Sequence, residues 1–94
     1  MLYWVSRSNK FLRSLKRVAQ YPNFDRDEIE YVVGLLRSGK TLPIHHHDHN
    51  LKGEHVGIRE CHIKNDLLLL YQKKEDTLIL LLVDIGTHAS IFGK

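Results

Sequence analysis

The chain has 94 residues, of which 43% are hydrophobic and 27% charged, and its net charge is +3 at pH 7. These values are typical of one globular domain over residues 1–94, and they exclude a disordered chain or a chain with two separate cores. The longest apolar runs are far shorter than the roughly 18 residues that a membrane span requires. The apolar start also lacks the long hydrophobic region of a signal peptide, so we expect a cytoplasmic protein with no membrane partner.

Two helices are expected in the N-terminal half, after an extended run at residues 2–5. Ser6 is expected to cap the first helix, in which apolar residues recur at spacings of three and four. Asp25, with Glu28 three residues later, resembles a capping box and predicts the start of the second helix, which Gly39 can end. Lys and Arg outnumber Asp and Glu two to one in residues 1–40. The basic face of the first helix is therefore either a solvated surface or a contact for a polyanion such as nucleic acid.

Extended structure is expected in the second half of the chain. Three strands are predicted at residues 56–63, 67–73 and 77–85, the last two joined by a connection short enough for an antiparallel hairpin. In the segment "LILLLV" (78–83), both the odd-numbered and the even-numbered positions are apolar. Its strand should therefore be covered on both faces and lie inside the sheet.

The loop between these halves contains "HHHDHNLKG" (45–53), which holds four of the seven histidines. Imidazoles suit zinc, but three adjacent histidines in a flexible loop are not expected to converge on one ion. His49, His62 and His88 allow another interpretation. His49 lies in the loop leading to the sheet, His62 ends the first predicted strand and His88 follows the last, so all three can meet at one rim of the sheet. Each of them, taken alone, is also compatible with a polar surface position.

Such a set of imidazoles can cleave RNA without a metal by using the 2′-hydroxyl of the RNA itself. One group removes the hydroxyl proton and another protonates the leaving 5′-oxygen. Asp66 is placed to orient an imidazole or hold it protonated. Lys52 and Arg59 are cations for the phosphate, and Phe92 is an aromatic that can stack on a base.

Three segments together resemble a known family: "DHNLKG" (48–53), "IRECHIKNDLLLLY" (58–71) and "GTHASIF" (86–92). They are similar, in order and spacing, to the hallmark segments of the YafQ branch of RelE-type bacterial toxins. The resemblance implies an α+β fold with two N-terminal helices packed on a small, mostly antiparallel sheet. It also implies a toxin of a type II toxin–antitoxin system that cleaves messenger RNA on the ribosome, without a metal or cofactor, and is neutralised by a cognate antitoxin protein.

Carried over residue by residue, the resemblance places the active-site positions on His49, His62, His88, Glu60, Asp66 and Phe92. Glu60 stands where the best-known relatives have Asp, Asn65 replaces a common proline, and His55 a frequent tryptophan. His45, His46 and His47 match no motif of the family and are interpreted as loop decoration. Two other functions stay open: an RNA- or ribosome-binding translation inhibitor with weak catalysis, and a histidine-rich metal-binding regulator.

Overall fold

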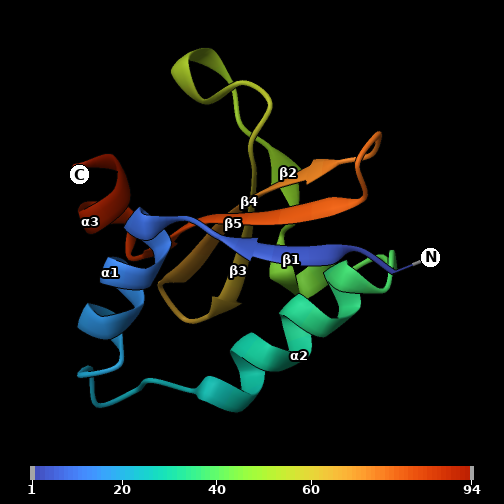
Figure 1. Cartoon of the computed structure of the whole chain (residues 1–94). Coiled ribbons are helices and arrows are strands. Elements are labelled where there is room, and N and C mark those ends of the chain that lie inside the picture. Colours follow the sequence, from blue (N-terminus) through green and yellow to red (C-terminus); the bar gives the residue numbers. More distant parts are fainter. Residues whose placement is uncertain (1, 94) are drawn as a thin grey trace.

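The computed structural model describes residues 2–93, so Met1 and Lys94, the two ends of the predicted domain, lie outside the described part of the chain. The elements (Figure 1) are, in chain order, β1 (Trp4–Arg7), α1 (Asn9–Val18), α2 (Arg26–Arg37), the 3₁₀ turn η1 (Ile44–His46), β2 (His49–Asn50), the 3₁₀ turn η2 (Gly53–His55), β3 (Arg59–Lys64), β4 (Leu67–Lys74), β5 (Ile79–Gly86) and α3 (His88–Phe92).

One sheet organises the fold, with its strands in the order β1-β5-β4-β3-β2. Neighbouring strands are antiparallel except for β1, which pairs in parallel with β5. Helices α1 and α2 lie on one side of this sheet, and the short α3 follows the end of β5 (Figure 1). The predicted fold class, two N-terminal helices packed on a mostly antiparallel sheet, is therefore confirmed.

The hydrophobic core lies between the two helices and the sheet. Its most deeply buried members come from α1 and α2 on one side and from the three longest strands on the other: Phe11, Val18, Val32, Leu36, Cys61, Leu69, Tyr71, Leu80 and Ile85. The strand β5 has partners on both sides, β1 and β4, so the interior position predicted for "LILLLV" is confirmed. Burial raises the pKa of the Cys61 thiol to about 12, so this cysteine stays protonated and acts as a core residue.

The starts of the two helices test the capping predictions. The prediction for Ser6 is wrong, because Ser6 lies inside β1, opposite Leu81 in the parallel ladder. Ser8 is the cap instead, and its hydroxyl accepts a hydrogen bond from the Phe11 backbone N–H at 2.9 Å. The prediction for α2 is confirmed, since the Asp25 carboxylate accepts the Glu28 backbone N–H at 3.1 Å.

Two strands begin later than predicted, for local backbone reasons. The 3₁₀ turn η2 and Gly57, which has a φ of 91°, occupy the start of the first predicted strand, so β3 begins at Arg59. Leu78 has a φ of 55°, in the left-handed region, and therefore belongs to the turn before β5. The parallel pairing of β1 and the two-residue strand β2 were not predicted.

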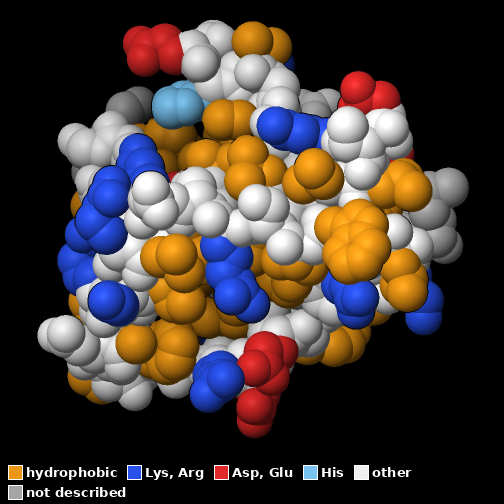
Figure 2. All heavy atoms as spheres, in the orientation of Figure 1, with side chains coloured by type: hydrophobic (Ala, Val, Ile, Leu, Met, Phe, Trp, Pro, Cys, Tyr) orange, Lys and Arg blue, Asp and Glu red, His pale blue; other side chains and the backbone are white. Residues whose placement is uncertain are grey.

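The surface of the molecule is basic over α1. Figure 2 shows Lys and Arg side chains gathered along the left edge of this view, where Figure 1 places α1. Within residues 2–93, no helix has both the length and the apolar character needed to cross a membrane.

Candidate active site

The strand β3 carries two titratable side chains on the face of the sheet turned away from the core. Side chains alternate along a strand, so Cys61 and Ile63 enter the core beneath the helices, whereas Glu60 and His62 point to the other face. The Glu60 side chain is only 6% exposed and that of His62 is 28% exposed. Burial lowers the pKa of His62, so this ring is mostly neutral at pH 7.

The short strand β2 brings His49 to the same carboxylate. His49 is the ladder partner of Glu60, and its Nε2 lies 3.6 Å from Glu60 Oε1. His62 Nε2 lies 3.7 Å from the same oxygen. The His49 ring is held by its other nitrogen, because Nδ1 donates a hydrogen bond to the His47 carbonyl at 2.6 Å. A buried carboxylate therefore lies beside two imidazoles, each presenting Nε2.

His88 reaches this group from the first turn of α3. A Cβ at position 86 would collide with the Ser90 hydroxyl, so Gly86 is what allows α3 to pack closely on the end of β5. Thr87 caps the helix with a reciprocal capping box. His88 Nδ1 then donates to Asp66 Oδ1 at 2.6 Å, and this hydrogen bond lowers the pKa of the Asp66 carboxyl. Because Nδ1 is occupied, Nε2 of His88 is free to face a substrate.

These contacts assemble what we call the histidine cluster: His49, Glu60, His62 and His88. The ring centroids of His62 and His88 are 5.8 Å apart, with the rings edge to face. One donor atom from each of Glu60, His62 and His88 lies within 4.8 Å of the other two. Such a group can hold a transition metal ion, or it can exchange protons with a substrate placed between the imidazoles.

An open hollow of about 800 Å³ adjoins the histidine cluster. It is lined by Leu51, Lys52, Glu54, His55, Glu60, His88, Ile91 and Phe92. The structure thus places Lys52 and Phe92 beside Glu60 and His88, as the sequence predicted for a substrate-binding surface. The contact of His55 with Phe92, at 5.6 Å between ring centroids and edge to face, was missed because no local spacing links these two residues.

The structure does not bring Arg59 to the histidine cluster. Arg59 alternates with Glu60 along β3, and its guanidinium pairs with Asp48 Oδ2 at 3.2 Å and donates to Asn50 Oδ1 at 2.8 Å. Its Nε also donates to the Tyr71 hydroxyl at 3.2 Å, and the hydrogen bonds to Asp48 raise the pKa of Arg59. Arg59 therefore anchors the loop before β3 instead of facing the hollow.

The three neighbouring histidines of the loop have different environments. His45 and His47 are exposed, but His46 is only 1% exposed and its Nδ1 donates to the His62 carbonyl at 2.5 Å. The interpretation of all three as loop decoration is therefore wrong for His46. The three adjacent histidines do not all converge, but His45 and His46 each place a donor atom within 4.8 Å of a Glu28 oxygen. The turn η1 fixes this segment, which the sequence pattern could not show.

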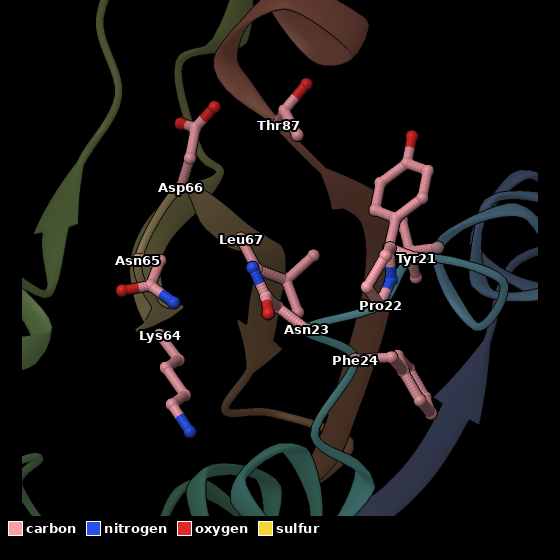
Figure 3. Close-up of a pocket in the computed structure, with 10 residues that line it drawn as sticks. Tyr21, Pro22, Asn23, Phe24, Lys64, Asn65, Asp66, Leu67 and Thr87 are labelled. Atoms are coloured by element: carbon pink, nitrogen blue, oxygen red, sulfur yellow. The ribbon is translucent and has the colours of Figure 1, made fainter.

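A second hollow, of about 300 Å³, lies next to the turn that carries Asp66. Figure 3 shows Lys64, Asn65 and Asp66 of the β3–β4 turn on one side of this hollow. The connection between α1 and α2, from Tyr21 to Phe24, lies on the other side. Thr87, which precedes His88, also lines it, so an apolar recess sits directly beside the Asp66–His88 pair.

Comparison with known proteins identifies the family. Residues 3–93 match the model of the family described as "Bacterial toxin of type II toxin-antitoxin system, YafQ". Over 90 residues the chain is 30% identical to the mRNA interferase toxin YafQ of Escherichia coli K12, and the match covers 95% of each protein.

Solved structures agree with this match. A metal-bound toxin from Helicobacter pylori superposes with a TM-score of 0.87 and 40% sequence identity, over 98% of this chain and all of that one. A chain of the E. coli DinJ–YafQ toxin–antitoxin complex superposes with a TM-score of 0.86 and 26% identity, over 99% of this chain and all of that one. The chain therefore belongs to the YafQ family of bacterial toxins of type II toxin–antitoxin systems.

Proposed function

We propose that this toxin blocks translation by cutting messenger RNA on the ribosome, with histidines as acid and base. Membership of the YafQ family and the curated mRNA interferase relative make the chain an endoribonuclease. The observation that carries the rest of the proposal is the histidine cluster, in which neutral and carboxylate-paired imidazoles lie side by side at the mouth of a hollow. A ribosome-directed enzyme of this kind acts in the cytoplasm.

The proposed reaction transfers one proton at each end of the scissile phosphate. His62 takes the proton of the RNA 2′-hydroxyl, and the resulting oxygen attacks the adjacent phosphorus. The P–O5′ bond breaks, and His88 gives its Nε2 proton to the leaving 5′-oxygen, so the products are a 2′,3′-cyclic phosphate and a free 5′-hydroxyl. Glu60 stabilises the imidazolium that forms at His62, because Glu60 Oε1 lies 3.7 Å from His62 Nε2. His49, beside the same oxygen, is the helper.

Substrate contacts are assigned to the rest of the hollow. The Lys52 ammonium adds positive charge for the phosphate, and the Phe92 ring offers a face on which a base can stack. Asp66 is a positioning residue: it accepts a hydrogen bond from His88 Nδ1 and so holds the ring with Nε2 free. Arg59 has no part in this proposal, because its guanidinium is held by Asp48.

Cleavage is expected to need no metal ion. The imidazole nitrogens that exchange protons with the RNA in the proposed reaction are the atoms that would otherwise coordinate an ion. Free RNA is the suitable substrate for this test, since ribosomes themselves require Mg²⁺. Slow cleavage of free RNA should persist in excess EDTA, and His47→Ala should keep activity within about twofold, as expected for an exposed residue outside the histidine cluster. A collapse of the rate in EDTA would contradict this expectation.

Substrate delivery by the ribosome is expected to accelerate cleavage by at least about tenfold over free RNA of the same sequence. A domain of 94 residues with a net charge of +3 has few contacts with which to order a flexible strand, and ribosomal RNA can supply the missing positioning. The test compares initial rates on messenger bound to purified ribosomes and on the free transcript, with a His88→Ala variant as the background control. Equal rates would make the chain a self-sufficient nuclease.

The proposed protein partner is a cognate antitoxin. The similar YafQ of E. coli has been solved in a complex with the antitoxin DinJ, which supports a partner of the same kind for this family member. The net charge of +3 favours a partner segment that is acidic or amphipathic.

A further inference from the structure

We propose that Glu28, His45 and His46 form a zinc-binding site that is distinct from the histidine cluster. One donor atom from each of these three residues lies within 4.8 Å of the other two. Two imidazole nitrogens and one carboxylate oxygen are a common donor set for Zn²⁺, with a water molecule as the fourth ligand. None of these three residues takes part in the proposed cleavage reaction.

The buried atom His46 Nε2 points to a ligand. His46 is 1% exposed, and its Nε2 is the one buried side-chain nitrogen or oxygen within residues 2–93 that has no hydrogen-bond partner. Its Nδ1 lies 2.5 Å from the His62 carbonyl oxygen, which can only accept, so Nδ1 carries the proton. In the neutral ring the lone pair is therefore on Nε2, the form in which histidine binds a metal.

The distance to Glu28 is too long for a hydrogen bond and slightly longer than the separation of two ligands on one zinc ion. His46 Nε2 and Glu28 Oε2 are 3.7 Å apart, too far for a direct hydrogen bond. Two ligands of a tetrahedral zinc ion, each about 2.0–2.1 Å from the metal, are about 3.3 Å apart. A shift of a few tenths of an ångström would bring the pair into coordination, and the Glu28 side chain, which is 31% exposed, has room to make it.

The surroundings supply the remaining features of a metal site. The hydrogen bond from His46 Nδ1 to a backbone carbonyl is the outer-shell contact that orients metal-ligating histidines and fixes their tautomer. Glu28 lies in the first turn of α2, whose cap Asp25 is tied to Lys64 of β3 at 3.1 Å. A hollow of about 450 Å³, lined by Glu28 and His45 among others, gives access to an ion and to its water ligand.

An ion at this site would join three parts of the fold. His45 and His46 belong to η1, Glu28 belongs to α2, and the Nδ1 hydrogen bond of His46 reaches β3 at His62. The proposed role is therefore structural: zinc would fix the loop that leads to His49 against the strand that carries His62.

The test is ring-nitrogen NMR of the full chain during titration with Zn²⁺ alone. The signals of His45 and His46 are expected to shift on zinc binding, in the wild type and in the Asp27→Asn control. Asp27 lies in the same first turn of α2, so its replacement removes an equal charge without removing a ligand. Glu28→Gln should weaken the zinc response of His45 and His46 by at least about tenfold, since even outer-shell losses cost that much. Should Glu28→Gln fail to fold, His45→Gln at an exposed position removes a ligand instead.

Two results would overturn the proposal. Zinc that shifts only the signals of His49, His62 and His88 binds at the histidine cluster, and His46 is then a buried histidine paired with Glu28. An undiminished response of His45 and His46 in a folded Glu28→Gln variant would show that Glu28 is not a ligand. Neither result bears on the cleavage mechanism, which is measured separately on RNA.

Discussion

Replacing His88 with Ala is expected to lower single-turnover cleavage of messenger on ribosomes by about 10²- to 10⁴-fold, the usual value of a general acid or base. Asp66, whose pKa this contact lowers, accepts a hydrogen bond from His88 Nδ1 at 2.6 Å and so holds the ring with Nε2 directed to the leaving oxygen. The His88 side chain is 50% exposed, so removing it takes little from the core. The variant should therefore stay folded and still bind its antitoxin.

The control for this experiment is His47→Ala, which removes an exposed imidazole outside both the histidine cluster and the proposed zinc site and should keep nearly full activity. Asp66→Asn adds a second comparison. It should lower the rate less than His88→Ala, because the acid remains but loses the carboxylate that positions it. A loss smaller than about tenfold for His88→Ala would move the acid role to His49 or His62.

Replacing His62 with Gln is expected to cost about 10²- to 10⁴-fold and also to change how the rate depends on pH. Burial lowers the pKa of His62 below its ordinary value of 6.5, so the folded protein holds the ring neutral down to a pH below 6.5. A general base must be neutral to accept a proton. The wild-type rate should therefore fall as the pH is lowered through a midpoint below 6.5, and this fall should disappear in His62→Gln.

The matched variant is His49→Gln, which removes the other imidazole beside Glu60 Oε1. Single-turnover rates between about pH 5.5 and 7.5 on messenger-programmed ribosomes decide between the two rings. If His49→Gln abolishes the fall at low pH and His62→Gln keeps it, His49 is the base and His62 the helper.

The sequence predicted the fold and the histidine positions better than the environment of each side chain. Local patterns led to the right elements. These patterns are the apolar residues at helical spacing, the cap at Asp25 and the segment "LILLLV", which is apolar on both faces of its strand. His49, His62 and His88 were expected near one rim of the sheet, but His49 reaches it through the unpredicted strand β2 and His62 from within β3. The parallel pairing of β1 with β5 depends on the whole fold, because nothing in four residues of β1 specifies a partner so distant in the chain.

Two properties were not evident from the sequence: the direction in which a side chain points from its strand, and the burial of a loop residue. Arg59 precedes Glu60, and alternation on β3 sends its guanidinium to Asp48 and away from the hollow. The pattern "HHH" gives no sign that its middle member is buried. That burial depends on η1 folding back onto β3, where the His62 carbonyl accepts the His46 proton.

The parallel pairing of β1 with β5 also bears on how fast the protein folds. The strands β3, β4 and β5 form a meander with short connections, so their contacts close small loops and can form early. Pairing Trp4 with Ile79 closes a loop that contains most of the chain. Closing this loop costs more conformational entropy than closing the short loops of the meander. The histidine cluster and the hollow are built entirely from residues after η1. The C-terminal half, which carries the histidine cluster, is therefore expected to form first. The docking of β1 onto β5 is expected to limit the folding rate.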